Sequence, residues 1–342
     1  MFGYYFTEID DNQSDVLYME ETASKDSNGE SGQVAPEEGI ADLSRPEIGL
    51  STLIGKQVDS LKSTFGEPNR IDPSAYGYEW WIYNNDGKKY MQVGVDQGKI
   101  VTLYAIGDKV DITPFKIGET IEKLFSSVLI GTDINFVYEG TNYHFEMSEE
   151  DMNSRPLVKM GDIYAQLNID KYTGKLSSVR FIDIRTLIIQ RPYELAYRGE
   201  LPESEPILDE AWESIEEGSK LQIFDITNIM RKRYGISELD WDEEVARVAY
   251  LHSKDMFETN TISHTSEQFG DLSDRLKTAN VLYQLAGENI AANYIDAPAV
   301  MEGWLNSKPH RESLLNDKFT HIGIGVYHKH FTQNFIEQKS KM

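Results

Sequence analysis

His264, Glu288 and His310 are the residues whose types and spacing best suit chemistry, and each lies in a different local sequence context. Separate elements that bring imidazole and carboxylate groups together can form a small polar site. Two imidazoles and one carboxylate can hold a zinc ion with water in the fourth position, as in catalytic zinc sites. Such an ion lowers the pKa of its bound water and generates a nucleophile. The candidate metal ligands are His264 and His310, for zinc or another divalent cation, with Glu288 as a third ligand or a catalytic base.

The same three residues also allow a site without a metal. In this alternative, the two imidazoles form hydrogen bonds with Glu288 and with the backbone. Glu288, which stands between Gly287 and Asn289, could equally be a buried structural carboxylate that holds a turn through backbone N–H groups. If Glu288 is buried beside a histidine, its pKa will depend on that neighbour.

Serine chemistry is a weaker expectation. Ser263, Ser266 and Ser307 lie near the candidate residues, but none stands in a Gly-x-Ser-x-Gly elbow. A nucleophile, base and acid triad also requires a geometry that spacing does not establish. The sequence therefore favours a His and Glu cleft over a serine hydrolase.

His252 is predicted to be a core residue rather than a ligand. It belongs to a helical stripe in which Trp241, Val245, Val248, His252 and Met256 recur at intervals of three or four residues. Three further polar residues follow the apolar helix that carries Trp304, and they are expected either to line the cleft or to cap the helix end. These residues are Asn306, Ser307 and Arg311.

Residues 219–337 are expected to form the domain that positions these groups. Their periodicity predicts helices around a short antiparallel sheet, which implies a three-layer α+β domain. The expected elements are a helix over 221–234 ended by Gly235, a helix started by a capping box of Asp240 and Glu243, a helix starting near Asp296, and strands over 322–326 and 331–337.

Residues 49–198 contain an internal duplication, with copies over about 49–112 and 113–198. The stretch 90–96 resembles 164–170, and a Gly-Lys turn follows each. Each copy predicts a helix followed by three strands, so the domain is expected to be a pseudo-symmetric α+β unit. Further matches pair Ile54-Gly55 with Ile117-Gly118 and residues 81–83 with 136–138, and the polar segment 148–162 is the expected insertion in the second copy.

Trp80 and Trp81 are consecutive in a predicted strand of the first copy. Their side chains must therefore point to opposite faces of the sheet. Burial of both faces within a duplicated domain is the main interpretation. The alternative is an exposed aromatic that binds a glycan or peptide together with Arg70 and Asp72.

The remaining segments predict a tether and a linker. The first 50 residues carry twelve Asp or Glu against two Lys or Arg, and residues 1–48 are expected to be a disordered acidic tether. Residues 199–218 combine two prolines with several acidic residues, which is typical of a semi-extended linker.

Composition excludes several classes of protein. The formal net charge of −24 argues against nucleic-acid binding, because a phosphate backbone favours Lys and Arg. The chain has no cysteine, so disulfides and thiol chemistry are excluded. The sequence has no apolar run long enough to span a membrane. Residues 1–6 lack the pattern of a signal peptide, so either the protein is cytosolic, which is the weaker expectation, or an export or anchor segment lies outside this sequence.

The second domain resembles the bacterial branch of the CAP superfamily of cysteine-rich secretory, antigen 5 and pathogenesis-related proteins. The resemblance covers about 120 residues in order. The first domain is similar to the CAP-associated N-terminal domain found in Firmicutes, through residues 65–68, 70–74, 76–77 and 80–83. The matching stretches of the second domain are 252–256, 263–266, Arg275, 287–291, 304–307, 310–311, 322–326 and 332–335.

The resemblance implies an α-β-α sandwich with a cleft that holds two histidines and acidic residues, and that binds zinc or another divalent ion in some members. By position, His264 and His310 match the histidines and Glu288 matches the first acidic residue. The position of the second acidic residue holds Ser307. This departure leaves three candidate groups and weakens any mechanism that needs two carboxylates.

The expected function is therefore a non-enzymatic binding module at the cell surface or in the cell envelope. Its partner is expected to be a protein, a cell-wall component or a small molecule, and the aromatic-rich repeats make a homodimer conceivable. The alternatives are a metal-dependent hydrolase that uses the same cleft and a lipid-binding protein, as some members of the family are.

Overall fold

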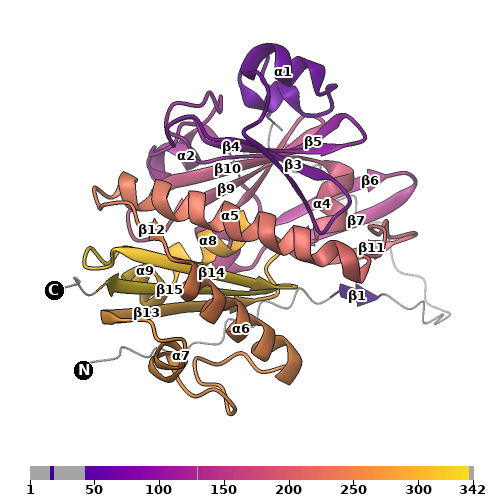
Figure 1. The fold of residues 1–342 in the computed structure, drawn as a ribbon. Helices are drawn as coiled ribbons and strands as arrows, with labels where there is room; N and C mark the ends of the chain where they lie inside the picture. Colours follow the sequence, from indigo (N-terminus) through magenta and orange to yellow (C-terminus); the bar gives the residue numbers. More distant parts are fainter. Residues whose placement is uncertain (1–15, 19–42, 129, 339–342) are drawn as a thin grey trace.

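The computed structural model describes residues 16–18, 43–128 and 130–338. The chain forms stacked layers of sheet and helix (Figure 1). The large sheet of the first domain faces α5 (Asp209–Arg233) and α8 (Ala297–Asn306), which cover one side of the second domain's sheet. On the other side of that sheet lie α6 (Glu243–Thr259) and α7 (Leu272–Thr278). The α-β-α sandwich expected for the second domain is confirmed.

The first domain is built on a seven-stranded sheet with the order β2-β3-β4-β5-β10-β9-β8. The hairpins β4-β5 and β9-β10 meet where β5 pairs antiparallel with β10. This is the arrangement that two copies of one hairpin unit produce. The strands are β2 (Arg70–Pro73), β3 (Glu79–Tyr83), β4 (Met91–Asp96), β5 (Lys99–Ala105), β8 (Leu157–Met160), β9 (Ile163–Asp170) and β10 (Lys175–Asp183).

Equivalent hydrogen bonds support the duplication. In each copy, backbone N–H groups at or just before the start of the helix donate to carbonyl oxygens near the turn of the next hairpin. The helices are α1 (Asp59–Phe65) and α2 (Ile121–Ser127). The bonds are Gly55 N–H to Ile100 O (2.7 Å) and Val58 N–H to Gly98 O (2.8 Å) in the first copy, and Gly118 N–H to Leu176 O (2.8 Å) and Ile121 N–H to Gly174 O (2.9 Å) in the second.

One expected match between the copies is wrong. Residues 136–138 lie in β6, which belongs to a second sheet with the order β1-β11-β7-β6 and not to the sheet of β3. The strand that occupies the place of β3 beside the second hairpin is β8, which lies within the segment 148–162 together with α3 (Glu149–Ser154). The second sheet contains β1 (Val16–Tyr18), β6 (Asp133–Tyr138), β7 (Thr141–Glu146) and β11 (Glu194–Arg198), and α4 (Ile184–Gln190) precedes β11.

Trp80 and Trp81 are both buried, with 2% and 7% of their surfaces exposed. Trp81 lies in the core of the first domain. Trp80 points the other way and packs with α5 residues such as Ile223 and α8 residues such as Trp304. The second domain therefore covers Trp80, and one of the apolar clusters contains residues of both domains.

Arg70 and Asp72 are also part of the contact between the domains. Arg70 bonds to Asp72 at 2.7 Å and to Asp225 of α5 at 3.2 Å. Asp72 in turn accepts a 2.9 Å hydrogen bond from Gln222 of α5. These groups hold the domains together, which leaves no exposed glycan site on them.

The second domain differs from the expectation at three points. The helix expected over 221–234 begins at Asp209, so the irregular linker is confined to 199–208. The cap of α6 is Asp242, which accepts a hydrogen bond from the Val245 N–H, whereas Asp240 lies in a short strand. Glu288 lies in a strand and not in a turn.

The sheet of the second domain has the order β12-β14-β15-β13. Its strands are β12 (Asp240–Trp241), β13 (Tyr283–Ala292), β14 (His321–Tyr327) and β15 (His330–Gln338), and α9 (Lys308–Leu314) follows α8.

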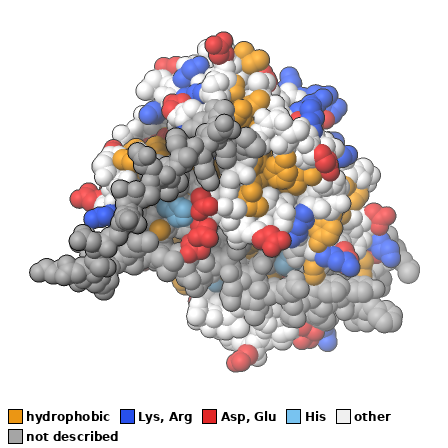
Figure 2. All heavy atoms as spheres, turned by 180° about the vertical axis from the view of Figure 1, so that it is seen from behind, with side chains coloured by type: hydrophobic (Ala, Val, Ile, Leu, Met, Phe, Trp, Pro, Cys, Tyr) orange, Lys and Arg blue, Asp and Glu red, His pale blue; other side chains and the backbone are white. Residues whose placement is uncertain are grey.

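On the face in Figure 2, acidic and basic side chains are both scattered among uncharged and apolar ones. Over the described parts of the chain, no helix is long and apolar enough to cross a membrane. The expected tether over 1–48 falls mainly outside the described residues, and within it Val16–Tyr18 pairs in parallel with β11.

Candidate functional site

Glu288 lies at the centre of the candidate site. It projects from β13 and is bonded by groups from two other segments. His264, in the loop after α6, approaches Oε1 of Glu288 with Nδ1 at 2.9 Å. Arg275, from α7, donates from Nη2 to both carboxylate oxygens, at 3.0 and 2.9 Å. A third group, Nε2 of His252 on α6, lies 3.9 Å from Oε1, which is too far for a hydrogen bond.

The carboxylate of Glu288 is ionised because of these neighbours. Its side chain is 4% exposed. Burial acts to raise the pKa, but the charge of Arg275 and the hydrogen bond from His264 outweigh it and lower the pKa below its ordinary value. A buried carboxylate is tolerated when a paired cation and hydrogen bonds satisfy it. Glu288 is thus a fixed negative charge with both oxygens occupied.

The Glu288 carboxylate determines which nitrogen of His264 carries the proton. An ionised carboxylate only accepts hydrogen bonds, so this contact requires a proton on Nδ1 of His264. In the neutral tautomer of that form, Nε2 carries the lone pair. The His264 side chain is 12% exposed. A carboxylate–histidine pair of this kind orients imidazoles in metal sites and in triads.

His310 supplies the second imidazole, from α9. Burial lowers its pKa to about 4, and the neighbouring His264 acts in the same direction. Its Nδ1 is buried without a hydrogen-bond partner among the described residues. Asn289, the residue after Glu288, holds the backbone here by donating to the His310 carbonyl at 3.1 Å. His310 is therefore a neutral imidazole at neutral pH, as metal binding requires.

The described residues offer too few ligands for a catalytic zinc site. No group of three His, Cys, Asp or Glu side chains is placed to hold an ion among residues 16–18, 43–128 and 130–338. Both oxygens of Glu288 are already bonded to Arg275 and His264. Catalytic zinc sites use three protein ligands, and His264 and His310 alone do not supply them.

The side chains of three residues expected near His264 and His310 make their contacts elsewhere in the structure. Asn306 donates to the Ile169 carbonyl at 2.8 Å and accepts from the Lys171 N–H at 2.9 Å. Arg311 bonds Asp170 through both terminal nitrogens, at 2.9 and 3.1 Å. These partners all belong to the first domain, which the sequence of the second domain does not reveal. Ser307 lines a different cleft between the domains.

Arg275 is the functional residue that the sequence reasoning did not place in the site. Its burial marks it, but only once the structure is known. It lies in the last turn of a short helix capped by Asp271, and it is 6% exposed. A cation that is buried so fully requires an anionic partner, and Glu288 is that partner.

His252 makes the stability of the second domain depend on pH. Burial lowers its pKa to about 4, against the opposing charge of Glu288, while an unfolded histidine has a pKa of about 6.5. The folded state therefore binds the proton less readily than the unfolded state. The contribution of His252 to stability is fully present above about pH 6.5 and is lost as the pH falls toward 4. We expect His252 to account for a loss of roughly 2–3 kcal/mol between pH 7 and pH 4.5.

Urea unfolding at the two pH values, with wild type and His252→Gln, measures this effect. The glutamine side chain stays neutral at both pH values, so the variant should lose less stability on acidification. The difference between the two losses isolates His252 from the carboxylates that titrate in the same range. Equal losses in wild type and variant would show that His252 does not drive the change.

Comparison with protein families gives two matches. Residues 54–193 match the CAP-associated N-terminal family, and residues 224–336 match the cysteine-rich secretory protein family. These ranges agree with the two domains of the structure.

Relatives match nearly the whole chain. A Bacillus subtilis protein named "Uncharacterized membrane protein YlbC" is 48% identical over 327 residues, which cover 94% of each chain. A solved structure of an extracellular protein with an SCP domain from Bacillus anthracis is 42% identical, with a TM-score of 0.82, and covers 92% of this chain and 100% of its own. A cysteine-rich secretory protein from Staphylococcus aureus is 30% identical, with a TM-score of 0.76, and covers 87% and 96%.

Proposed function

Because the chain belongs to the cysteine-rich secretory protein (CAP) family, with a CAP-associated domain before its CAP domain, we propose that it is an extracellular or envelope-associated binding module. Its ligand would be a small polar molecule, or a divalent ion, that contacts the imidazoles of His264 and His310. The observation that carries this proposal is the bonding of Glu288. Both of its oxygens serve to fix Arg275 and His264, which leaves the imidazoles as the groups that face a ligand.

The bonding of Glu288 also favours a binding module over a metal-dependent hydrolase. A hydrolytic role would need Glu288 as a general base or as a third metal ligand. A general base must reach the proton it removes, and the pKa of Glu288 lies below its ordinary value. Glu288 acts instead as a positioning residue for His264.

Two relatives support the proposed location. The Bacillus anthracis protein is described as extracellular, and the Bacillus subtilis protein is named a membrane protein. Both descriptions fit a protein that acts outside the cytoplasm or at its boundary. The large negative charge also suits a module whose partner is not a polyanion.

Zinc chloride is a suitable probe of the cleft, because zinc binds neutral imidazoles. By isothermal titration calorimetry we expect one weakly bound zinc per chain. His264→Ala or His310→Ala should each weaken binding at least tenfold, a loss of about 1.4 kcal/mol. His144→Ala replaces a more exposed histidine of the first domain, whose side chain is 37% exposed, and is the matched control.

Two results would contradict the proposal. The first is a zinc affinity that neither His264→Ala nor His310→Ala changes, because the cleft would then not be the binding site. The second is hydrolysis of an ester or peptide substrate by the zinc-loaded protein that His264→Ala abolishes, because the protein would then be an enzyme.

A further inference from the structure

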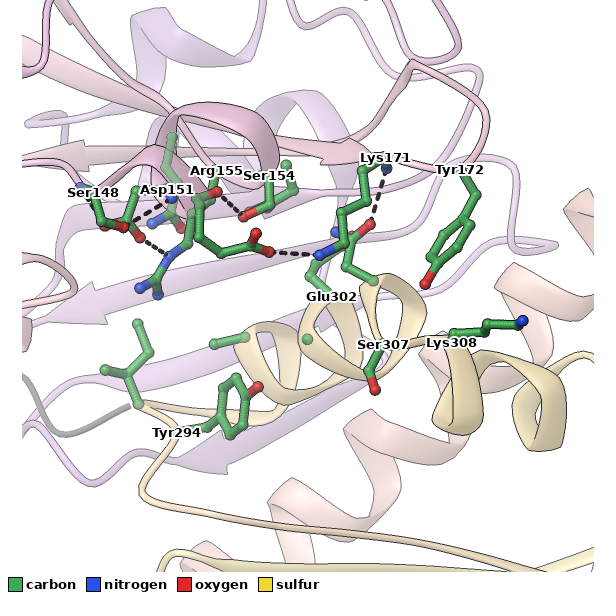
Figure 3. Close-up of a pocket in the computed structure, with 17 residues that line it drawn as sticks. Ser148, Asp151, Ser154, Arg155, Lys171, Tyr172, Tyr294, Glu302, Ser307 and Lys308 are labelled. Atoms are coloured by element: carbon green, nitrogen blue, oxygen red, sulfur yellow. Dashed lines mark hydrogen bonds and ion pairs between the residues drawn. The ribbon is translucent and has the colours of Figure 1, made fainter. Parts of the chain in front are cut away.

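A second cleft lies between the two domains, away from the His264 and Glu288 pair. It has a volume of about 420 Å³. On one side are α3 and β9 of the first domain, and on the other are α8 and the start of α9 (Figure 3). Ligand pockets in proteins typically measure about 300–1,000 Å³ and favour domain interfaces. Its size and place thus suit a small ligand.

Charges in this cleft largely cancel. Lys171 pairs with Glu150 at 2.7 Å, and Arg155 pairs with Asp151 at 2.6 Å (Figure 3). Glu302 and Lys308 are the remaining charged residues of the lining, and they are opposite in sign. The cleft therefore does not select strongly for a cation or an anion, although the whole chain is highly acidic.

Glu302 of α8 is a buried carboxyl group at the wall of the cleft. It is 6% exposed. Its Oε1 accepts hydrogen bonds from Ser178 at 2.6 Å and from Tyr104 at 2.9 Å. Its Oε2 is buried and has no hydrogen-bond partner within the described residues. An unsatisfied buried polar atom is unfavourable, so a ligand group that reached Oε2 would be favoured. Burial raises the pKa of Glu302 above its ordinary value, against the opposing hydrogen bonds from Ser178 and Tyr104.

Two tyrosines add aromatic surface to the cleft. Tyr172 lies at the rim and is 48% exposed. The guanidinium of Arg311 lies 4.9 Å from its ring centre and helps to hold the ring. Tyr294 lies against α8 at Gly303, where an added Cβ would come within 2.3 Å of the tyrosine hydroxyl. Such rings offer an apolar face with a polar edge.

We infer that this cleft binds an uncharged, polyhydroxylated ligand of about the size of a disaccharide. Hydroxyl groups both donate and accept hydrogen bonds, which matches a lining of hydroxyl and amide side chains with balanced charge. A sugar ring can also pack its apolar face on Tyr172. The hydroxyl and amide residues that line the cleft are Ser148, Ser154, Gln166, Asn168, Asn306 and Ser307.

The test is titration of the full chain with N,N′-diacetylchitobiose and with cellobiose, followed by calorimetry or by NMR. We expect at least one of them to bind. Tyr172→Ala should weaken binding at least tenfold, whereas Tyr250→Ala, which removes a comparably exposed tyrosine on α6 (39% exposed), should not. His264→Ala should leave saccharide binding unchanged, which separates this site from the proposed His264 and His310 cleft.

Three variants test the wall and the volume of the cleft. Glu302→Gln keeps the size of the side chain and an oxygen that accepts from Ser178 and Tyr104, so binding should stay within about threefold of wild type, whereas Glu302→Leu should weaken it more than tenfold. Ser307→Trp fills the cleft from a residue whose side chain makes no helix-capping bond, and it should abolish binding without unfolding the protein.

Three results would overturn the inference. They are no binding of either saccharide at millimolar concentration, saccharide binding that survives Ser307→Trp, and a charged tripeptide that binds in this cleft more tightly than the saccharides.

Discussion

Replacing Gly325 with alanine is expected to destabilise the second domain by about 3 kcal/mol or more. The reason is the contact between β14 and α6. A Cβ at Gly325 would lie 2.0 Å from the backbone nitrogen of Tyr250, and one at Gly323 would lie 2.0 Å from that of Ala246. The obstructing atoms are helix backbone, which cannot rotate away as a side chain can. The whole helix would have to move outward from the sheet.

Movement of α6 would also break polar contacts. The Ser253 hydroxyl donates to the Gly325 carbonyl at 3.0 Å and shares a 2.8 Å hydrogen bond with Thr332 of β15. His252, the neighbour of Ser253 on α6, lies close to Glu288. A displaced helix would therefore disturb the candidate site as well as the core.

Thermal unfolding of Gly325→Ala measures this effect, and we expect the midpoint to fall by about 5–10 °C. Gly131→Ala is the matched control, because a Cβ there would meet no atom closer than 3.8 Å. A midpoint for Gly325→Ala that equals that of the control would show that α6 does not pack on β14 as the structure has it.

The sequence predicted the strand that carries Gly323 and Gly325 but not the reason for the glycines. Alternation of Ile322, Ile324 and Val326 is enough to indicate a half-buried strand. The reason becomes clear only when α6 is placed on it. The periodicity of one element does not reveal which other element approaches its backbone.

The candidate site could be predicted in part. The types and the order of His264 and Glu288 were sufficient to select them, and the structure places them in contact. Arg275 was not selected for the site, because its pairing with Glu288 depends on where α7 docks against β13. His252 was expected in the core, and it is 1% exposed, but its closeness to Glu288 could not be inferred from its place on a helical stripe.

The contact between the domains was the least predictable feature. Asn306 and Arg311 were expected to line the cleft or cap a helix, and Trp80 was expected to be buried within the duplicated first domain. Their partners lie in the other domain, far away in the chain. Such pairings depend on the docking of two folded units, and local propensity carries no information about docking.

Glu288→Gln is expected to lower the free energy of unfolding by about 3–5 kcal/mol at pH 7. The replacement keeps the size of the side chain but removes its charge. Arg275, whose side chain is 5% exposed, would then be a buried cation without its anionic partner. His264 would lose the carboxylate that holds its Nδ1. Urea unfolding followed by circular dichroism measures the change.

A matched control and a double variant make this test specific. Glu244→Gln removes one carboxylate from a pair with Arg247 at 2.9 Å, but both side chains are more than half exposed, so its effect should stay within about 0.5 kcal/mol. Replacing both Glu288 and Arg275 with leucine should cost less than the sum of the single changes, because neither charge is then left unpaired.

The size of the Glu288→Gln effect also decides between the two roles for this residue. A large loss means that Glu288 is held as the structural partner of Arg275, which leaves His264 and His310 to meet a ligand. A loss below about 1 kcal/mol would contradict the expectation, because a surface-like cost indicates a carboxylate that is not committed to Arg275. Glu288 would then be free to act as a base or as a third metal ligand, and the hydrolase alternative would gain the group that it lacks.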